Sequence, residues 1–571
     1  MTDTKPGHSV DIAPFMRPPS EVMRLARMGS SHPTRLSFLR VLLRRLAGAD
    51  WQIDRPVWQV DQRGVGHGVY RVKGAGGRVY SLVAFAHDLP DEMRSDRVIA
   101  TAWDATFALF DGDPSPRDIA RLQQNVPLQE AGRIRASELT LARANRSVRL
   151  FEHVVSALAA GRQPDPEEIA AVGYLMRTTA VYGSGKFGAS DRADIATRPE
   201  LAPPFQVEML TVWLIRAFTV DIAEHMAAIR GGSRATTLNY ATRRALGVGN
   251  STGLGMAPFI VNHPVLLNNW FMAREQALAR VRAQPGADPN AVAGLQSALE
   301  ACIQNAAAWR SEHPLQQGKL QDLRRDLALI SDHIAQWNTA APLPWNTLWN
   351  WGAEALSVEG QEALLSLVLE PHGALIDDLA DHMGADEAAH FRINGAMNVA
   401  RLRDILQTRY DWALAVNFSL PENVARFWYV SEEKLEPRLG ERATEAGAER
   451  EQPLCIARLM RALFDTLQKM DGEMPVAALL MAHPEHRYAV RRAQIAQTHP
   501  YAEVHDNLIS ADMLPIDLLR CKLAFFGATH FDPRSDRWVR ICLFGNAPYP
   551  EDLQSEGTDD WPYPTLEHAR A

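Results

Sequence analysis

Apolar residues recur at helical spacing along most of the chain beyond Arg117. Proline and glycine separate most of these stretches, as at Pro164–Pro166, Pro203–Pro204 and Pro342–Pro344. Because proline cannot continue a helix, this pattern predicts many separate helices. The expected helical segments are Ile134–Ala160, Pro166–Val181, Phe205–Ile229, Pro264–Ala283, Ala291–Ser311, Leu320–Trp337, Glu359–His382, Asn398–Ala415 and Leu454–Met470.

The amino-terminal part has a different pattern. Val69–Val72 and Val79–Ala84 alternate apolar and polar residues on either side of the glycine-rich turn Gly74–Gly77, which predicts an antiparallel hairpin. Thr101–Gly112 is a candidate third strand, and Arg35–Leu46 reads as a short amphipathic helix. We therefore expect a mainly α protein of the α+β class: a large multi-helix body with a small amino-terminal antiparallel β-sheet.

These patterns divide the chain of 571 residues into three parts. We expect a small α/β amino-terminal domain over residues 1–115 and a helical main domain over residues 116–533. The last part, residues 534–571, is rich in Asp, Pro and aromatic residues and is expected to be an irregular carboxy-terminal tail.

Composition excludes several classes of protein. Hydrophobic residues make up 46% and charged residues 22% of the chain, which is ordinary for a globular protein. The net charge of −8 provides no basic field for nucleic acid or an anionic membrane surface. The longest stretch without charged residues, Ala245–Ala273, contains two prolines and many polar residues, so it does not predict a membrane helix.

The cysteine pattern indicates a reducing compartment. The four cysteines, Cys302, Cys455, Cys521 and Cys542, form no CxxC pair, so neither a disulfide scaffold nor a zinc ribbon is expected. The amino terminus shows no basic region followed by an apolar run, as a signal peptide would. We therefore expect a soluble protein of the cytoplasm.

The first segment that could carry chemistry is glycine-rich and runs from Val181 to Asp191. Gly183 and Gly185 allow the backbone to approach a ligand closely, and Lys186 could hold a phosphate or a carboxylate. The spacing does not match a P-loop. The alternative interpretation is a helix end and turn with an exposed lysine.

The second segment, Gly247–Phe271, offers neutral hydrogen-bonding groups among glycines, which suits a loop folded over a polar ligand. A counter-ion would have to come from an arginine such as Arg234, Arg243 or Arg244. The alternative is a buried loop whose polar side chains satisfy helix ends. The polar residues are Asn250, Ser251, Thr252, Asn262, His263, Asn268 and Asn269.

Part of this second segment resembles the mobile loop of the fumarase and aspartase lyases, which reads Gly-Ser-Ser-x-Met-Pro-x-Lys-x-Asn. Ser251, Met256, Pro258 and Asn262 occur here in that order, with extra residues between them and without the lysine. The likeness covers only this loop. It implies a lyase-like mechanism to test rather than membership of the family.

The sequence thus predicts an enzyme that acts on a small anionic metabolite by acid–base chemistry at loops 183–191 and 249–263. The expected catalytic residues are Lys186 as the anion holder, Ser251 as general base or nucleophile, and His263 as its partner. The expected substrate-binding residues are Gly183, Gly185, Asn250, Thr252, Asn262 and Asn269.

Two other classes of function remain open. The same loops could serve a phosphate- or nucleotide-binding transferase. Alternatively, the protein could be a non-catalytic assembly protein or homo-oligomer, with an interface formed by aromatic clusters such as the three tryptophans that follow Pro344. No metal is predicted, because the acid–His pairs Asp221/His225, Asp378/His382 and Asp386/His390 are typical of solvated helix faces. The sequence identifies no cofactor.

Overall fold

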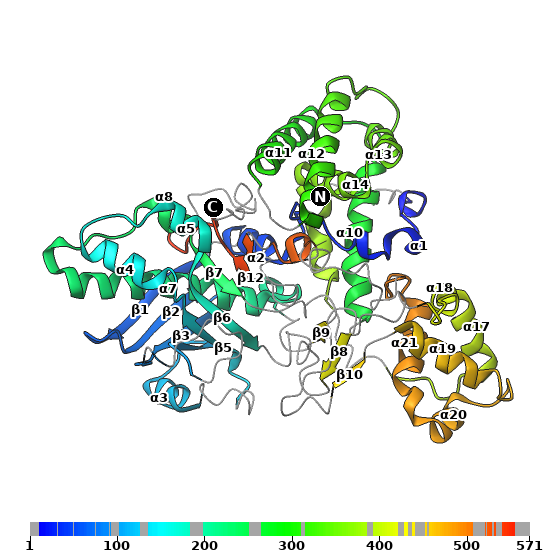
Figure 1. Ribbon diagram of the computed structural model, residues 1–571, viewed down its shortest axis with the longest axis horizontal. Coiled ribbons are helices and arrows are strands. Elements are labelled where there is room, and N and C mark those ends of the chain that lie inside the picture. The colour runs from blue at the N-terminus through cyan, green and yellow to red at the C-terminus, as the bar shows by residue number, and fades with distance from the viewer. Residues whose placement is uncertain are drawn as a thin grey trace, which may run out of the picture.

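The fold is described from a computed structural model (Figure 1). The structure describes residues 11–30, 32–48, 51–74, 76–90, 92, 102–125, 135–182, 198–250, 264–309, 314–384, 392–420, 428–431, 437–439, 451–453, 456–505, 520, 522–527, 530–532 and 540–553. Within these ranges, no helix has both the length and the apolar character that crossing a bilayer requires.

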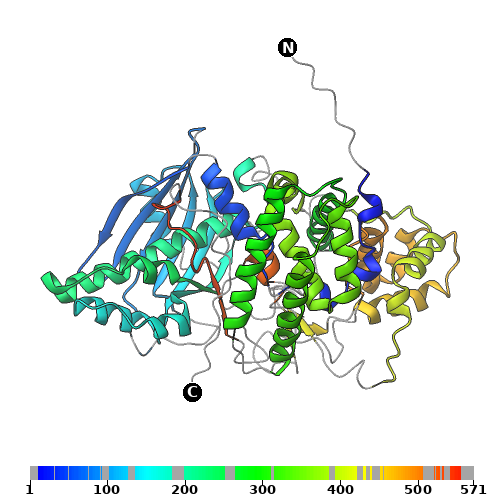
Figure 2. The same cartoon turned by 90° about the horizontal axis from the view of Figure 1, so that it is seen from above.

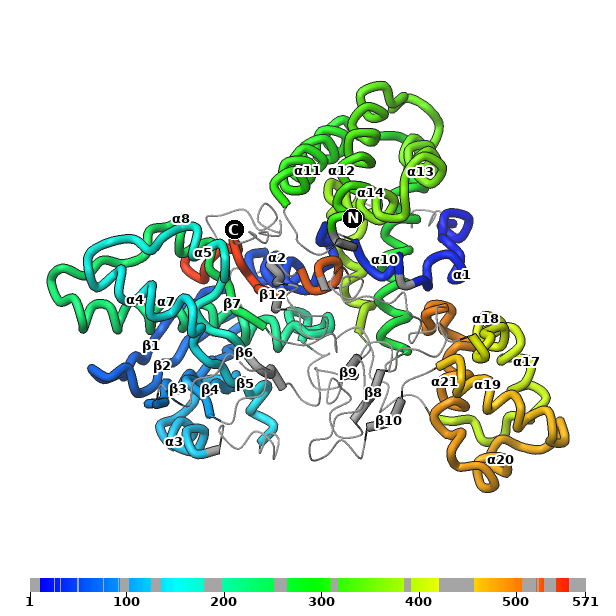
Figure 3. Tube along the Cα trace, viewed as in Figure 1, coloured from blue at the N-terminus to red at the C-terminus, as the bar shows by residue number. Residues whose placement is uncertain are grey.

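A nine-stranded mixed sheet forms one end of the molecule (Figures 1 and 3). Neighbouring strands are antiparallel except β6 and β7, which are parallel. In spatial order the strands are β1 (Gln52–Val60), β2 (Gly66–Lys73), β3 (Val79–Ala86), β4 (Ala105–Asp111), β5 (Glu138–Arg146), β6 (Tyr174–Tyr182), β7 (Gly247–Asn250), β12 (Arg540–Leu543) and β11 (His530–Asp532).

The predicted hairpin is confirmed. Strands β2 and β3 pair antiparallel, with Val69 opposite Val83 and Val72 opposite Tyr80. In the connecting turn, Gly77 adopts a φ of 75°, which glycine takes without steric cost. The candidate third strand is β4, which pairs with β3.

The expectation of a small amino-terminal sheet is wrong. Strands β5 and β6 arise from segments that were interpreted as helices, Ile134–Ala160 and Pro166–Val181. Only α4 (Phe151–Ala159) and α5 (Pro166–Val172) within them are helical. β5 is buried along almost its whole length, so it lacks the alternation of a half-exposed strand. Its leucines and alanines give a pattern that is also typical of a buried helix.

The sheet also includes strands from distant parts of the chain. β7 follows α7, and β12 comes from the segment that was expected to be irregular. Cys542 of β12 lies opposite Gly249 of β7. A local pattern of turn and alternation cannot predict this pairing, because α10–α21 lie between β7 and β12 in the sequence.

Two helices cover the two faces of the sheet. The long helix α7 (Gln206–Gly231) packs on one face, where the Phe218 ring lies 5.3 Å from that of Phe107 and 6.5 Å from that of Tyr70. On the other face, Leu122 of α3 (Pro116–Asn125) joins Val83, Phe85 and Leu141 in a smaller apolar cluster. The central strands β3, β4 and β5 are therefore buried between helices, whereas β1 at one edge of the sheet is exposed or half-buried.

The remaining helices form the rest of the molecule. Figures 1 and 2 show the sheet at one end, α10–α14 in the middle and α17–α21 at the other end. The main helices are α2 (Phe38–Gly48), α10 (Pro264–Arg282), α11 (Pro289–Ala308), α12 (Pro314–Ile334), α13 (Pro344–Ala355), α14 (Val358–Leu369), α17 (Val399–Arg409), α18 (Asp411–Leu414), α19 (Ile456–Leu467), α20 (Val476–Ala482) and α21 (Arg487–Thr498). Apart from the two segments that contain β5 and β6, each expected helical segment overlaps at least one of these helices or α7. A small second sheet has the order β10 (Glu451–Pro453), β8 (Trp428–Ser431) and β9 (Pro437–Leu439).

A buried ionic network fastens the amino-terminal segment to the middle helices. Arg17 donates two hydrogen bonds of 2.7 Å to Glu275 of α10 and one of 2.8 Å to Glu362 of α14. Arg27 donates a further bond of 2.9 Å to Glu362. Buried charges are stable only when they are paired in this way.

Candidate functional site

The second glycine-rich segment enters the sheet beside the strand that leads into the first. β6 and β7 run parallel, and Thr178 of β6 lies opposite Asn250, the last residue of β7. The Asn250 amide donates a hydrogen bond of 3.3 Å to the Thr178 hydroxyl, which donates one of 3.2 Å to the carbonyl oxygen of Gly249. The two strands run in the same direction, but their ends are staggered, because β6 continues beyond Thr178 to Tyr182.

Glycine is required in β7 for close packing. A Cβ atom at Gly249 would lie 2.7 Å from the ring of Tyr174, and one at Gly247 would collide with the Sγ atom of Cys542. These two glycines therefore let the neighbouring strands β6 and β12 approach. They are structural glycines and not a phosphate cradle.

A buried cation in β6 was not predicted from the sequence. Arg177 precedes Thr178 in β6, is 3% exposed and lies opposite Gly249. Successive strand residues point to opposite faces, so Arg177 and Thr178 present a charge and a hydroxyl on the two sides of the sheet. The segment had been interpreted as a helix. The β-branched and aromatic residues of Thr178–Tyr182 were the available signal for a strand.

Most of the predicted site residues lie outside the described part of the chain. These are Gly183, Gly185, Lys186, Ser251, Thr252, Asn262 and His263. The other two are described. Asn250 ends β7, whereas Asn269 of α10 donates a hydrogen bond of 2.8 Å to the carbonyl oxygen of Gly384.

The arginines considered as counter-ions lie elsewhere. Arg243 forms an ion pair with Glu551, and its guanidinium stands 4.4 Å from the Tyr549 ring centre. Arg244 donates a bond of 2.8 Å to the carbonyl oxygen of Asn546, and Arg234 is exposed in the turn after α7. Arg243 and Arg244 thus line a cavity of about 220 Å³ together with Leu238, Tyr240, Tyr549 and Asp552.

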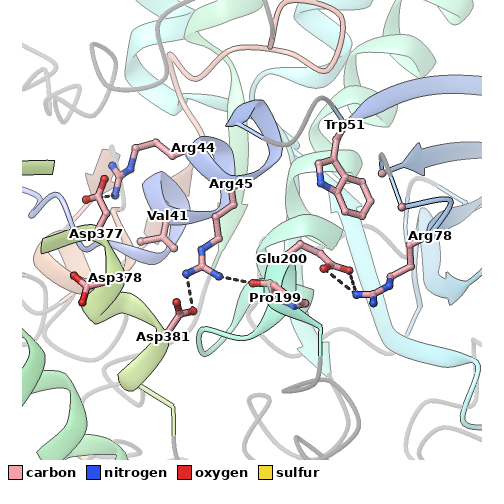
Figure 4. A pocket seen from close by; sticks show the side chains of 12 residues that line it. Val41, Arg44, Arg45, Trp51, Arg78, Pro199, Glu200, Asp377, Asp378 and Asp381 are labelled. Carbon is pink, nitrogen blue, oxygen red and sulfur yellow. Dashed lines mark hydrogen bonds and ion pairs between the residues drawn. The ribbon is translucent and has the colours of Figure 1, made fainter. Parts of the chain in front are cut away.

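A larger cavity of about 710 Å³ lies where α2 meets the β2–β3 turn, η6 (Pro199–Leu201) and η9 (Asp377–His382) (Figure 4). Its wall carries arginines and acidic residues from all these elements. The lining residues are Val41, Arg44, Arg45, Trp51, Gly74, Gly76, Arg78, Pro199, Glu200, Asp377, Asp378 and Asp381.

The charges of this larger cavity are already engaged with one another, as the dashed lines in Figure 4 show. Arg45 pairs with Asp381 at 2.6 Å, and Arg78 pairs with Glu200 at 2.7 Å. Asp378 forms an ion pair of 2.6 Å with Arg280, which is not among the lining residues. An anionic ligand would have to displace these carboxylates. The cavity is therefore a salt-bridged seam between the sheet and the middle helices rather than an anion site.

The acid–His pairs that were considered for metals have other contacts. Asp221 accepts hydrogen bonds of 2.6 Å from both Arg55 and Tyr70, while a ring nitrogen of His225 lies 3.1 Å from the carbonyl oxygen of Asp61. In the second pair, Asp378 is occupied by Arg280. The third pair, Asp386 and His390, lies outside the described residues.

The tryptophan cluster contributes mainly to the interior. Trp345 and Trp349 are 2% and 5% exposed, and Trp345 packs against Trp337 with ring centres 5.0 Å apart. The half-buried Trp351 stacks on His333 at 3.8 Å. These rings therefore bury most of their surface within the chain itself.

Comparison with protein-family models, curated proteins and solved structures finds no match for this chain. Function is therefore inferred from the geometry described above.

Proposed function

We propose that this protein is an enzyme that acts on a small anionic metabolite, a carboxylate or a phosphate, by acid–base chemistry at the carboxyl ends of β6 and β7. The proposal rests on one observation, the parallel pairing of β6 with β7 that sets Thr178 opposite Asn250. Ser251 directly follows the end of β7, and Gly183 directly follows the end of β6, five residues beyond Thr178. Both loops therefore leave neighbouring strands in the same direction.

General rules of sheet architecture support this location. Ligands of sheets with parallel strands bind beyond the carboxyl ends of those strands, where the chain leaves the sheet. The charge for the anion has to come from the loops themselves, where Lys186 follows the end of β6. A charge in an environment of low dielectric attracts an anion more strongly than it would in water.

The roles of the catalytic residues come from their chemistry and their place in the sequence. Lys186 holds the anionic group, Ser251 acts as general base or nucleophile, and His263 exchanges the proton with it. Asn250 and Asn269 provide neutral hydrogen bonds to the substrate. The cytoplasm remains the proposed location, supported by the free thiols of Cys302 and Cys542.

A thermal-shift screen of carboxylates and phosphates against the full chain tests the proposal. A ligand that binds the native state raises the melting temperature, and the chemical class of the hits separates a lyase-like enzyme from a phosphate-dependent transferase. Lys186→Ala should abolish the shift, whereas Lys469→Ala, on an exposed turn, should preserve it. Ser251→Ala should leave binding intact and lower turnover of the hit by about two orders of magnitude or more.

Ser233→Ala is the matched control for Ser251→Ala, because Ser233 is an exposed serine in the turn after α7. The proposal is wrong if no carboxylate or phosphate shifts the melting temperature. It is equally wrong if Lys186→Ala and Ser251→Ala bind and turn over the hit as the wild-type protein does.

A further inference from the structure

Two histidines and a glutamate gather at the start of α21, at the end of the molecule opposite the large sheet (Figures 1 and 2). The sequence His483-Pro484-Glu485-His486 links α20 to α21 through a single turn, η12 (Pro484–His486). One ligand atom from each of His483, Glu485 and His486 lies within 4.8 Å of the other two. The sequence interpretation did not consider this cluster.

A contact with α19 orients the His486 ring. The Thr466 hydroxyl oxygen lies 2.8 Å from Nε2 of His486 and 3.1 Å from the carbonyl oxygen of Ala462. In the tautomer with the ring proton on Nε2, the hydroxyl oxygen accepts a hydrogen bond from it, and Nδ1 keeps a lone pair for an ion. A second partner that orients the ring in this way is typical of histidines that bind metals.

Burial holds the His486 ring in position before any ligand arrives, because the residue is only 8% exposed. The ring therefore provides one preformed ligand of the cluster.

The side chains of His483 and Glu485 are exposed and can move toward an ion. Nδ1 of His483 lies 3.1 Å from a carboxylate oxygen of Glu485, and these side chains are 40% and 61% exposed. Ligand atoms around a tetrahedral zinc ion lie about 3.3 Å apart, as follows from bond lengths of about 2.0–2.1 Å. His483 and Glu485 therefore need to move toward the fixed His486 ring by at most about 1.5 Å, the difference between 4.8 and 3.3 Å.

We propose that His483, Glu485 and His486 bind one divalent transition-metal ion of the zinc type, with water at the fourth position. Two imidazoles and one carboxylate are a donor set that zinc accepts, and an open fourth position is compatible with tetrahedral coordination. This site is independent of the proposed enzyme function at β6 and β7.

Zinc titration of the full chain by calorimetry, and cobalt(II) absorption in the visible range, test the site. The wild-type protein should bind one zinc ion more tightly than any other, and cobalt(II) should give the absorption bands of tetrahedral coordination. His483→Ala and Glu485→Gln should each weaken this binding at least 10-fold. Both residues are exposed, so these variants keep the fold.

Matched controls separate this site from other surface histidines and acids. His499→Ala, at the other end of α21, and Glu473→Gln, in the turn before α20, should bind zinc as the wild-type protein does. If His483→Ala and Glu485→Gln also bind zinc with wild-type affinity, or if cobalt(II) gives only the spectrum of the free octahedral ion, the site does not exist.

Thr466 provides a test of the positioning contact. Thr466→Val removes the acceptor for the His486 Nε2 proton and should weaken zinc binding about 10- to 100-fold without removing a ligand. Thr408→Val is the matched control, because its hydroxyl also bonds back to a carbonyl oxygen, that of Asp404 at 2.8 Å, but touches no histidine in the described structure. Equal zinc affinity in Thr466→Val and Thr408→Val would show that this hydroxyl does not position a ligand.

Discussion

Arg17 and Glu275 share two hydrogen bonds of 2.7 Å, although 258 positions separate them in the chain. The side chains of both residues are almost completely buried. Arg17→Met should therefore lower the free energy of unfolding by about 3–5 kcal/mol, because it leaves the buried charges of Glu275 and Glu362 less well paired. Denaturant unfolding measures this loss.

The matched control is Arg63→Met, because Arg63 pairs with Asp61 at an exposed turn, where ion pairs contribute little. It should leave the unfolding midpoint unchanged. If Arg17→Met unfolds at the wild-type midpoint as well, the network does not stabilise the fold.

Acid should weaken this network. Burial opposes ionisation of Glu362, but the guanidiniums of Arg17 and Arg274 outweigh it and lower the pKa of Glu362 from 4.5 to about 2. A lowered pKa in the folded state means that the ionised group adds stability above pH 4.5 and loses this contribution as the pH falls toward 2. The free energy of unfolding should thus decline over that range. In Glu362→Gln the decline should be smaller, and an equal decline in both proteins would contradict this assignment.

The glycines of β7 offer a prediction on packing. Gly249→Ala should lower the free energy of unfolding by at least about 1–3 kcal/mol, since the new methyl group overlaps the Tyr174 ring. Gly76→Ala, in the β2–β3 turn, is the control, because a Cβ atom there meets nothing within 4 Å. Equal melting temperatures for the two variants would argue against close contact between β6 and β7.

Thiol reactivity tests the burial of two cysteines. Burial raises the pKa of Cys302 and that of Cys542 to about 12, and only the thiolate reacts quickly with thiol reagents. At most two thiols, those of Cys455 and Cys521, should therefore react in the native protein. All four should react after denaturation without reductant.

Cys302→Ala and Cys542→Ala provide the controls for thiol reactivity. Each should remove one thiol from the denatured count and none from the native count. Rapid reaction of three or more thiols in the native wild-type protein would contradict the burial of these two residues.

Sequence patterns predicted those parts of the fold that are set by neighbouring residues. The β2–β3 hairpin has a turn and alternating strands within 25 residues of chain, so its register follows from local chemistry. Helices α7 and α10 begin and end near prolines or glycines that mark them. The strands β5 and β6 were not recognised by periodicity, since burial on both faces removes the period-two signal, and only the β-branched and aromatic residues at the end of β6 indicated a strand.

The candidate site was also predicted only in part. Composition alone identified the two glycine-rich segments, and Asn250 was included as a ligand. The neighbouring positions of β6 and β7, the strands that precede the two loops, depend on the pairing of Thr178 with Asn250 across the crossover through α7, which no short-range pattern encodes. Arg177 was missed because its role depends on strand geometry.

The place of β12 in the sheet has a consequence for synthesis on the ribosome. The thiol of Cys542 donates a hydrogen bond to the carbonyl oxygen of Gly173, which is made 369 residues earlier. Gly249 of β7 precedes its partner Cys542 by 293 residues, so at about 5–20 residues per second β7 waits on the order of 15–60 seconds for β12. Throughout that interval the free edge of β7 has unpaired backbone groups, which can pair with another chain. Completion of this sheet is therefore among the last events in making the protein, and the interval before it is when a chaperone would matter most.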